Sequence, residues 1–156
     1  MAEQQAVIHV METQGAYGHA AAAVVAITLG ARVEGIVGPH VGLAGSMDEA
    51  PWDQLITVTT CAERLAPRRQ QEGAISAELM AECITVLTEG PVFAEIREHQ
   101  PQGGWAPYVQ QAAEQAARWL DDPRTWRAVI ALAGQLELRP DMNDEEVHAI
   151  VDPALS

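Results

Sequence analysis

The sequence has few cysteines, few basic residues and no long apolar run. Its two cysteines, Cys61 and Cys83, are too few for a disulfide framework, which indicates a protein that keeps its thiols reduced. Nine basic residues stand against 22 acidic ones, and the formal net charge is −13. Nucleic acids and anionic membrane surfaces are bound through basic patches, so this charge argues against both as partners.

No segment is suited to a membrane or to export. The apolar run at residues 20–27 is much shorter than the roughly 20 residues that cross a bilayer. Residues 1–5 lack the basic region that precedes the apolar core of a secretory signal. We therefore expect a cytoplasmic protein.

What is present fits a single globular domain over residues 1–156. A chain of 156 residues with a hydrophobic share of 48% can bury a substantial core. The acidic surface either keeps the protein soluble or attracts a cationic substrate or partner.

Residues 15–30 are the stretch around which the rest of the chain is expected to pack. Nearly all of them are small or apolar, and none carries a formal charge. A helix that is apolar on every side has to be surrounded by other elements. Gly30 is expected to end this helix in the left-handed conformation of a helix-terminating glycine.

The same stretch resembles the active-site helix of the FtsH-type zinc metallopeptidases, H-E-A-G-H-A-V-V-A-x-x-L-G. The matching framework residues are Ala20, Ala23, Val24, Val25, Ala26, Leu29 and Gly30. Residues 87–95 resemble a second family motif, L-A-G-x-x-A-E, and residues 126–151 resemble its closing helix pair. The resemblance implies the peptidase scaffold over most of the chain.

The positions that carry the family's chemistry differ here. Gly18 and Ala22 stand where the resemblance places the two zinc histidines, and His19 stands where it places the catalytic glutamate. No Asp or Glu lies between His99 and Gln111, where the family has its third ligand. Glycine and alanine have no ligand atoms, so we expect no zinc peptidase, no metal and no cofactor.

The expected fold is α+β and mainly helical, with two or three short strands beside the central apolar helix. Strands are predicted in residues 32–45, with Val33 facing the core and Pro39 interrupting the ladder, and in the β-branched residues 55–60. Residues 6–14 are compatible with a strand or a helix, and the resemblance favours a helix.

The remaining elements are expected to be helices and connectors. Residues 64–73 are predicted to be a polar connector that holds the main basic cluster. Helix start signals stand at Ser76, Asp122 and Asn143, and another helix is predicted over residues 107–120. The stripe of the first of these helices is Leu79, Met80, Cys83, Ile84 and Leu87. Cys83 is therefore expected to pack in the core rather than to act as a nucleophile.

Two groups of residues are candidates for a site. On one continuous helix, Glu12 and His19 would share a face and would serve as a base and its orienting partner, or would be two solvated residues. Gly18, Ala22, His40, Trp105 and Tyr108 are the candidate ligand-binding residues. Trp105 and Tyr108 would favour an apolar or aromatic ligand, with structural packing as the alternative.

Three functions remain open. The first is a non-proteolytic pseudo-peptidase whose vacated cleft binds a peptide, a small molecule or a protein partner. The second is a metal-independent enzyme that uses His19 as acid or base on a substrate in that cleft. The third is a metal site rebuilt from His9, His19 and His40 with Glu12, although their spacing lacks the i, i+4 regularity of a helix-borne site.

Overall fold

The computed structural model describes residues 3–9, 15–89 and 105–156. The elements in chain order are β1 (Gln4–His9), α1 (Gly15–Thr28), β2 (Arg32–Val37), β3 (His40–Gly45), α2 (Glu49–Glu72), α3 (Ala77–Glu89), α5 (Trp105–Asp121), α6 (Pro123–Leu138), β4 (Met142–Asn143) and α7 (Asp144–Leu155). The mainly helical α+β fold expected from the sequence is confirmed. The sheet has four strands rather than two or three.

Helix α1 lies at the centre of the fold, as its composition predicts. Gly18 and residues 20–26 are all buried. The helix packs against α2, α5 and α6 and against strands β2 and β3. Alanine side chains permit this close approach, because they leave little between one helix backbone and the next.

Gly30 ends α1 in the expected way. Its φ is +97°, and its amide donates to the Ile27 carbonyl at 3.0 Å, while the amide of Ala31 donates to the Ala26 carbonyl at 3.0 Å. These two bonds are those of a Schellman motif, in which glycine adopts the left-handed conformation without a Cβ clash. The chain then turns directly into β2.

The sheet is antiparallel, in the order β1-β3-β2-β4. Residues 32–45 form a hairpin of two strands around Gly38 and Pro39, and Val33 is fully buried as predicted. β1 pairs with β3 from Gln4 opposite Gly45 to His9 opposite His40. Residues 6–9 are thus part of a strand, which contradicts the helix that the resemblance favoured there, and residues 10–14 lie outside the described residues.

Residues 55–60 are not a strand, because they lie within the 24-residue helix α2. The threonine hydroxyls of this segment form hydrogen bonds with backbone carbonyls of the same helix. The Thr57 hydroxyl donates to the Asp53 carbonyl at 2.8 Å, and the Thr60 hydroxyl donates to the Ile56 carbonyl at 2.8 Å. The apolar residues that α2 buries recur at helical spacing, namely Trp52, Leu55, Val58, Cys61, Ala62, Leu65 and Ala66. Burial at this spacing outweighs the β propensity of the branched residues.

The predicted polar connector at residues 64–73 is also helical. It makes up the last turns of α2, which continues past Pro67 and ends at Gly73 with φ +82°. The arginines of this segment are therefore presented by a helix that packs against α3 and α5.

The predicted caps of the later helices are confirmed. The Ser76 hydroxyl accepts from the Leu79 amide at 3.1 Å, and the Asp122 carboxylate accepts from the Arg124 amide at 2.9 Å. Asn143 and Glu146 form a reciprocal capping box at the start of α7. Each cap satisfies amides that have no partner within the first helical turn.

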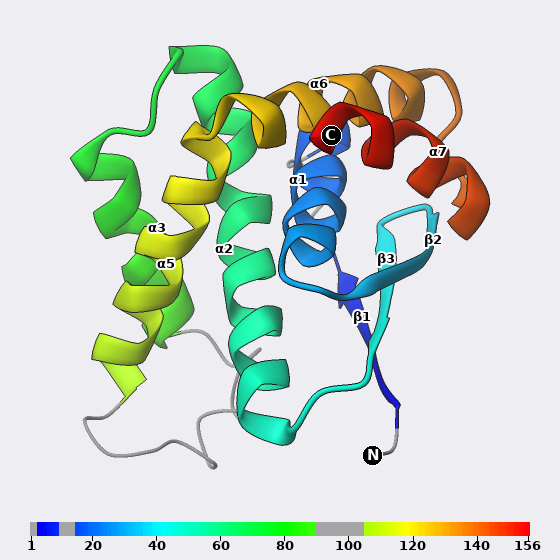
Figure 1. Ribbon diagram of the computed structural model, residues 1–156. Helices are drawn as coiled ribbons and strands as arrows, with labels where there is room; N and C mark the ends of the chain where they lie inside the picture. Colours follow the sequence, from blue (N-terminus) through cyan, green and yellow to red (C-terminus); the bar gives the residue numbers. More distant parts are fainter. Residues whose placement is uncertain (1–2, 10–14, 90–104) are drawn as a thin grey trace.

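Figure 1 shows how the elements are arranged around α2, which runs through the middle of the molecule. Helices α3 and α5 lie on one side of it, and α1 and the sheet lie on the other. Helix α6 runs across the top of the view, and α7 lies beside α6 and packs against β2. Among the described residues, no helix is long and apolar enough to cross a membrane.

Candidate functional site

The face of α1 that corresponds to a zinc site is packed. Gly18 and Ala22 are both buried, and Ala22 has no exposed surface. Nδ1 of His19 lies 2.7 Å from the Gly15 carbonyl oxygen, so Nδ1 carries the proton and donates it in this bond. Nε2 of His19 is covered and makes no hydrogen bond with the described residues.

These residues do not fit a zinc ion of the peptidase type. Gly18 and Ala22 have no side-chain atom that could bind a metal. His19 donates from Nδ1 to the Gly15 carbonyl of the same helix. Within the described ranges, no group of three or more His, Cys, Asp or Glu side chains is placed to hold a metal ion. Glu12 and the His9 side chain lie outside the described residues.

The continuous helix that would place Glu12 and His19 on one face includes residues 12–14, which lie outside the described residues. Gly15 has φ +59°, which lies in the left-handed region, and a regular α-helix cannot run through such a residue. The strand β1 precedes it in the chain. Among the described residues, the hydrogen-bond partner of the His19 ring is the Gly15 carbonyl.

Trp105 and Tyr108 lie in the first turns of α5 rather than in a loop. Their rings stack at a centroid distance of 5.4 Å, and the buried Trp105 indole donates from Nε1 to the Leu87 carbonyl at 3.4 Å. Burial raises the pKa of Tyr108, and the nearby Thr57 acts in the opposite direction. The pair joins α5 to α2 and α3, which is the packing alternative that the sequence left open.

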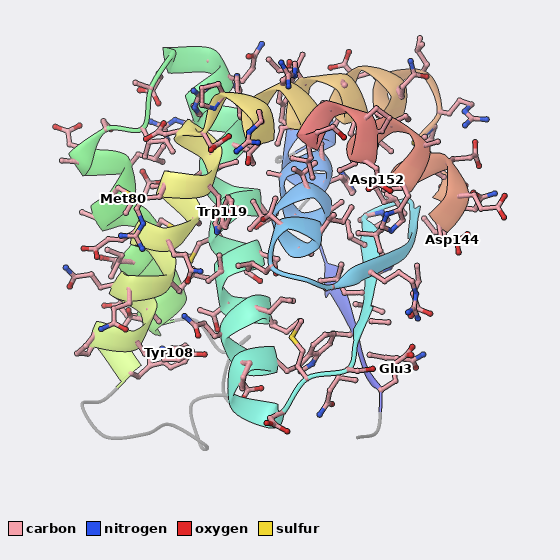
Figure 2. All side chains as sticks on the ribbon, in the orientation of Figure 1. Glu3, Met80, Tyr108, Trp119, Asp144 and Asp152 are labelled. Atoms are coloured by element: carbon pink, nitrogen blue, oxygen red, sulfur yellow. The ribbon has the colours of Figure 1, made fainter. Side chains whose placement is uncertain are left out.

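The two groups of candidate residues do not meet. Tyr108 lies beside Thr57 near the start of α2, and Figure 2 shows it at the lower end of α5. The N-terminal part of α1 lies at the opposite end, where Tyr17 and Arg69 both contact Trp126. Thr57 and Arg69 are twelve residues apart in α2, which is about 18 Å along a helix. The expectation of one cleft containing His19, Trp105 and Tyr108 is therefore wrong.

His40 is the first residue of β3 and is exposed at the hairpin turn. Its backbone pairs with Val37 of β2 and His9 of β1. The turn is held against the segment before α7 by Gly38, whose amide donates to the Asp141 carboxylate at 2.9 Å.

A cleft of about 500 Å³ lies at the end of the fold where α1 begins and α2 finishes. It is lined by Arg69, Asp121, Pro123, Trp126, Arg127, Ile130 and Ala131. Its volume is in the range of small-ligand sites. Ile130 is 45% exposed on this cleft.

Trp126 is positioned by two neighbours. The Tyr17 ring stacks with it at 6.0 Å between centroids, and the Arg69 guanidinium carbon lies 4.0 Å from its ring centroid. This distance is typical of a cation–π contact. The indole is thus held by α1 and α2 while it lines a cleft formed largely by α6.

The cleft is locally positive in a strongly acidic protein. Two arginines and one aspartate line it, although the whole chain has a formal charge of −13. The Arg69 Nε lies 3.5 Å from an Asp121 carboxylate oxygen and makes no hydrogen bond with the described residues. The Arg127 guanidinium donates to the Ala154 carbonyl at 2.9 Å. Both cations are held by neighbouring groups, and together they favour an anionic group on a ligand.

The sequence contained a partial signal for this cleft. Arg69 belongs to the basic cluster noted in residues 64–73. Nothing local in the sequence joins it to Tyr17 and Trp126, because the three residues come from three different helices.

Comparison with models of known protein families, with curated proteins and with solved structures finds no match to this chain.

Proposed function

We propose that this chain is a non-proteolytic binding domain that holds a small molecule or a peptide end in the cleft of Arg69 and Trp126. The ligand has an apolar or aromatic body, which contacts Trp126 and Ile130, and an anionic group that faces Arg69 and Arg127. The observation that carries this proposal is a cleft that is lined by two arginines and by apolar side chains, in a chain that is strongly acidic as a whole.

The same proposal includes a degenerate FtsH-type peptidase scaffold. The framework residues of α1 support it, as does the replacement of both helix-borne ligands by Gly18 and Ala22. A ligand at the original metal position would need space that α1 does not leave, since Ala22 is fully buried. The binding site is therefore assigned to the end of α1, beside Tyr17, rather than to the old zinc face.

The test uses 3-phenylpropionate as the probe and its uncharged amide as the matched ligand. Binding is followed by NMR at the tryptophan indoles. The carboxylate should perturb Trp126, and the amide should bind at least tenfold more weakly, because it lacks the charge-assisted contact with an arginine, worth about 1.4 kcal/mol or more.

Variants of the cleft locate the binding. Arg69→Gln should weaken carboxylate binding about tenfold, and Trp126→Ala should weaken the binding of both probes. Arg118→Gln is the matched control, because Arg118 lines a separate cleft with Trp119. Equal binding of acid and amide, or an equal effect of Arg118→Gln, would contradict the proposal.

A second measurement addresses hydrolysis. Protein purified without a metal-affinity tag should contain no stoichiometric zinc and should leave a generic peptidase substrate intact. One equivalent of zinc together with cleavage would overturn the non-proteolytic part of the proposal.

One observation favours an enzyme as the second candidate. The His19 ring is anchored through Nδ1, which leaves the Nε2 lone pair without a hydrogen bond from the described residues. Histidine is the side chain that enzymes use most often as a general base. This candidate applies if the wild type also converts a compound that it binds. His19→Ala should then abolish conversion and leave binding at Trp126 unchanged. Full turnover by this variant would exclude His19 from the mechanism.

A further inference from the structure

The two cysteines, 22 positions apart in the sequence, are neighbours in the structure. Cys61 is in α2 and Cys83 is in α3, and both are free and buried. Their thiols form a hydrogen bond with each other. A disulfide has an S–S length of roughly 2.05 Å, so two thiols have to be neighbours before they can form one.

The two thiols differ in their access to solvent. Cys83 lines a cleft of about 240 Å³ between α2 and α3, together with Arg64 and Arg68. Cys61 has no exposed surface and is not part of the cleft lining. A small reagent in the cleft therefore meets Cys83 first, with Cys61 as its buried neighbour.

The surroundings of the two thiols also shift their pKa values in opposite directions. The hydrogen bond with Cys61 is the main cause of a lowered pKa at Cys83; the nearby Arg64 acts in the same direction, against burial and the charges of Glu63 and Glu82. The hydrogen bond with Cys83 and complete burial raise the pKa of Cys61 well above its ordinary value. Cys83 is thus the better thiolate, and Cys61 keeps its proton as the donor.

We propose that Cys61 and Cys83 form a reversible disulfide couple in which Cys83 reacts with a hydroperoxide in the cleft and Cys61 resolves the product. The proposal rests on the contact between the thiols and on the arginine-lined cleft that reaches only one of them. It concerns a site separate from the Arg69 and Trp126 cleft, so neither proposal depends on the other.

The reaction balances with a hydroperoxide as the oxidant. The Cys83 thiolate attacks the terminal peroxide oxygen, the O–O bond breaks, and the leaving alkoxide or hydroxide takes a proton, which gives a sulfenic acid and an alcohol or water. The sulfur of Cys61 then attacks the sulfenic sulfur. The S–O bond breaks, water leaves with the Cys61 proton, and a disulfide forms. A small thiol reductant restores both thiols.

The first test uses the wild-type protein and hydrogen peroxide. Intact mass spectrometry should show the loss of two hydrogen atoms, and peptide mapping should join Cys61 to Cys83 within one chain. Both thiols should become inert to a maleimide added in denaturant and should react again after treatment with dithiothreitol. Thiols that stay fully alkylatable, or a disulfide between two chains, would overturn the proposal.

Two single variants assign the roles. Cys61→Ser should stop at a sulfenic acid on Cys83, which dimedone captures. Cys83→Ser should leave Cys61 unoxidised at the same peroxide concentration. Equal oxidation of Cys61 in that variant would contradict the order proposed. Should either variant fail to fold, the wild-type disulfide map still decides whether the couple exists, and dimedone capture at early times still decides which sulfur reacts first.

The cleft is tested through its arginine. Arg64→Gln should slow peroxide oxidation severalfold, because it removes a charge that favours the Cys83 thiolate. Arg118→Gln, which removes an arginine of another cleft, should not change the rate. Equal slowing by both variants would show an effect of net charge rather than of this site.

Discussion

At the scale of single residues, Tyr108 shows how one partly covered hydroxyl links stability to pH. Its phenol is packed between α5 and α2, and burial is the main cause of a raised pKa, with Asp53 and Cys61 acting in the same direction. A raised pKa in the folded state means that the folded protein resists loss of this proton more than the unfolded chain does.

This gives a prediction for alkaline stability. The stability that Tyr108 contributes is fully present below the unfolded pKa of about 10 and is lost as the pH rises through the folded value. Tyr108→Phe should therefore flatten the decline of the free energy of unfolding between about pH 9 and about pH 11. Urea titrations of both proteins at several pH values measure the two slopes.

Part of the alkaline decline should remain in this variant, since the pKa of Cys61 is raised as well. Identical slopes for wild type and Tyr108→Phe would show that the phenol titrates freely.

Also at this scale, His148 illustrates a polar contact that the sequence did not reveal. Its Nε2 accepts from the Val33 amide at 3.3 Å, across 115 positions in the sequence. Its Nδ1 lies 3.4 Å from an Asp152 carboxylate oxygen. This contact connects α7 with β2, where the pairing of β2 with β3 shifts register.

At the scale of secondary-structure elements, the glycines at two helix positions have opposite roles. Gly30 terminates α1 with φ +97°, and the nearest atom to an added Cβ would be the Met47 methyl at 3.9 Å. Gly134 lies in the exposed part of α6, where an added Cβ would have no atom within 4 Å. Space is available at both positions, so only the backbone conformation distinguishes them.

We therefore predict opposite signs for the two alanine substitutions. Gly30→Ala should lower the free energy of unfolding by about 1 kcal/mol, because a left-handed conformation is strained with a Cβ. Gly134→Ala should raise it by about 0.5–1 kcal/mol, because alanine is the better residue inside a helix. Thermal and urea unfolding of the two variants, side by side with wild type, measure both changes; a common sign would refute the backbone argument.

At the scale of the whole molecule, α1 is the helix on which helices and sheet converge. It contacts α2, α5 and α6 on the helical side and β2 and β3 on the sheet side. Such packing depends on the small volume of its side chains, since interiors are filled close to the density of organic crystals.

Enlarging one of these side chains should therefore destabilise the fold. Ala22→Leu is expected to lower the free energy of unfolding by about 1–3 kcal/mol through overpacking. Ala81→Leu provides the matched control, because Ala81 is exposed on α3 and the same change there should stay within about 0.5 kcal/mol. Tolerance of leucine at Ala22 would reveal open space on the face of α1 that holds Gly18 and Ala22.

The sequence alone determined the features that depend on neighbours along the chain. The burial of α1 on all sides, its termination at Gly30 and the caps at Ser76, Asp122 and Asn143 are confirmed. Each follows from residues within one or two helical turns, where backbone conformation and side-chain hydrogen bonds are decided locally.

Only the tertiary structure decided the features that join distant segments. It showed that residues 55–60 are helical, because burial along α2 outweighs their β propensity. It brought Arg69 to Trp126 and Cys61 to Cys83, and it separated Tyr108 from the N-terminal end of α1. Periodicity predicts which face of a helix is buried, but it does not predict which distant segment packs against that face. Both clefts of this protein are formed by such long-range contacts.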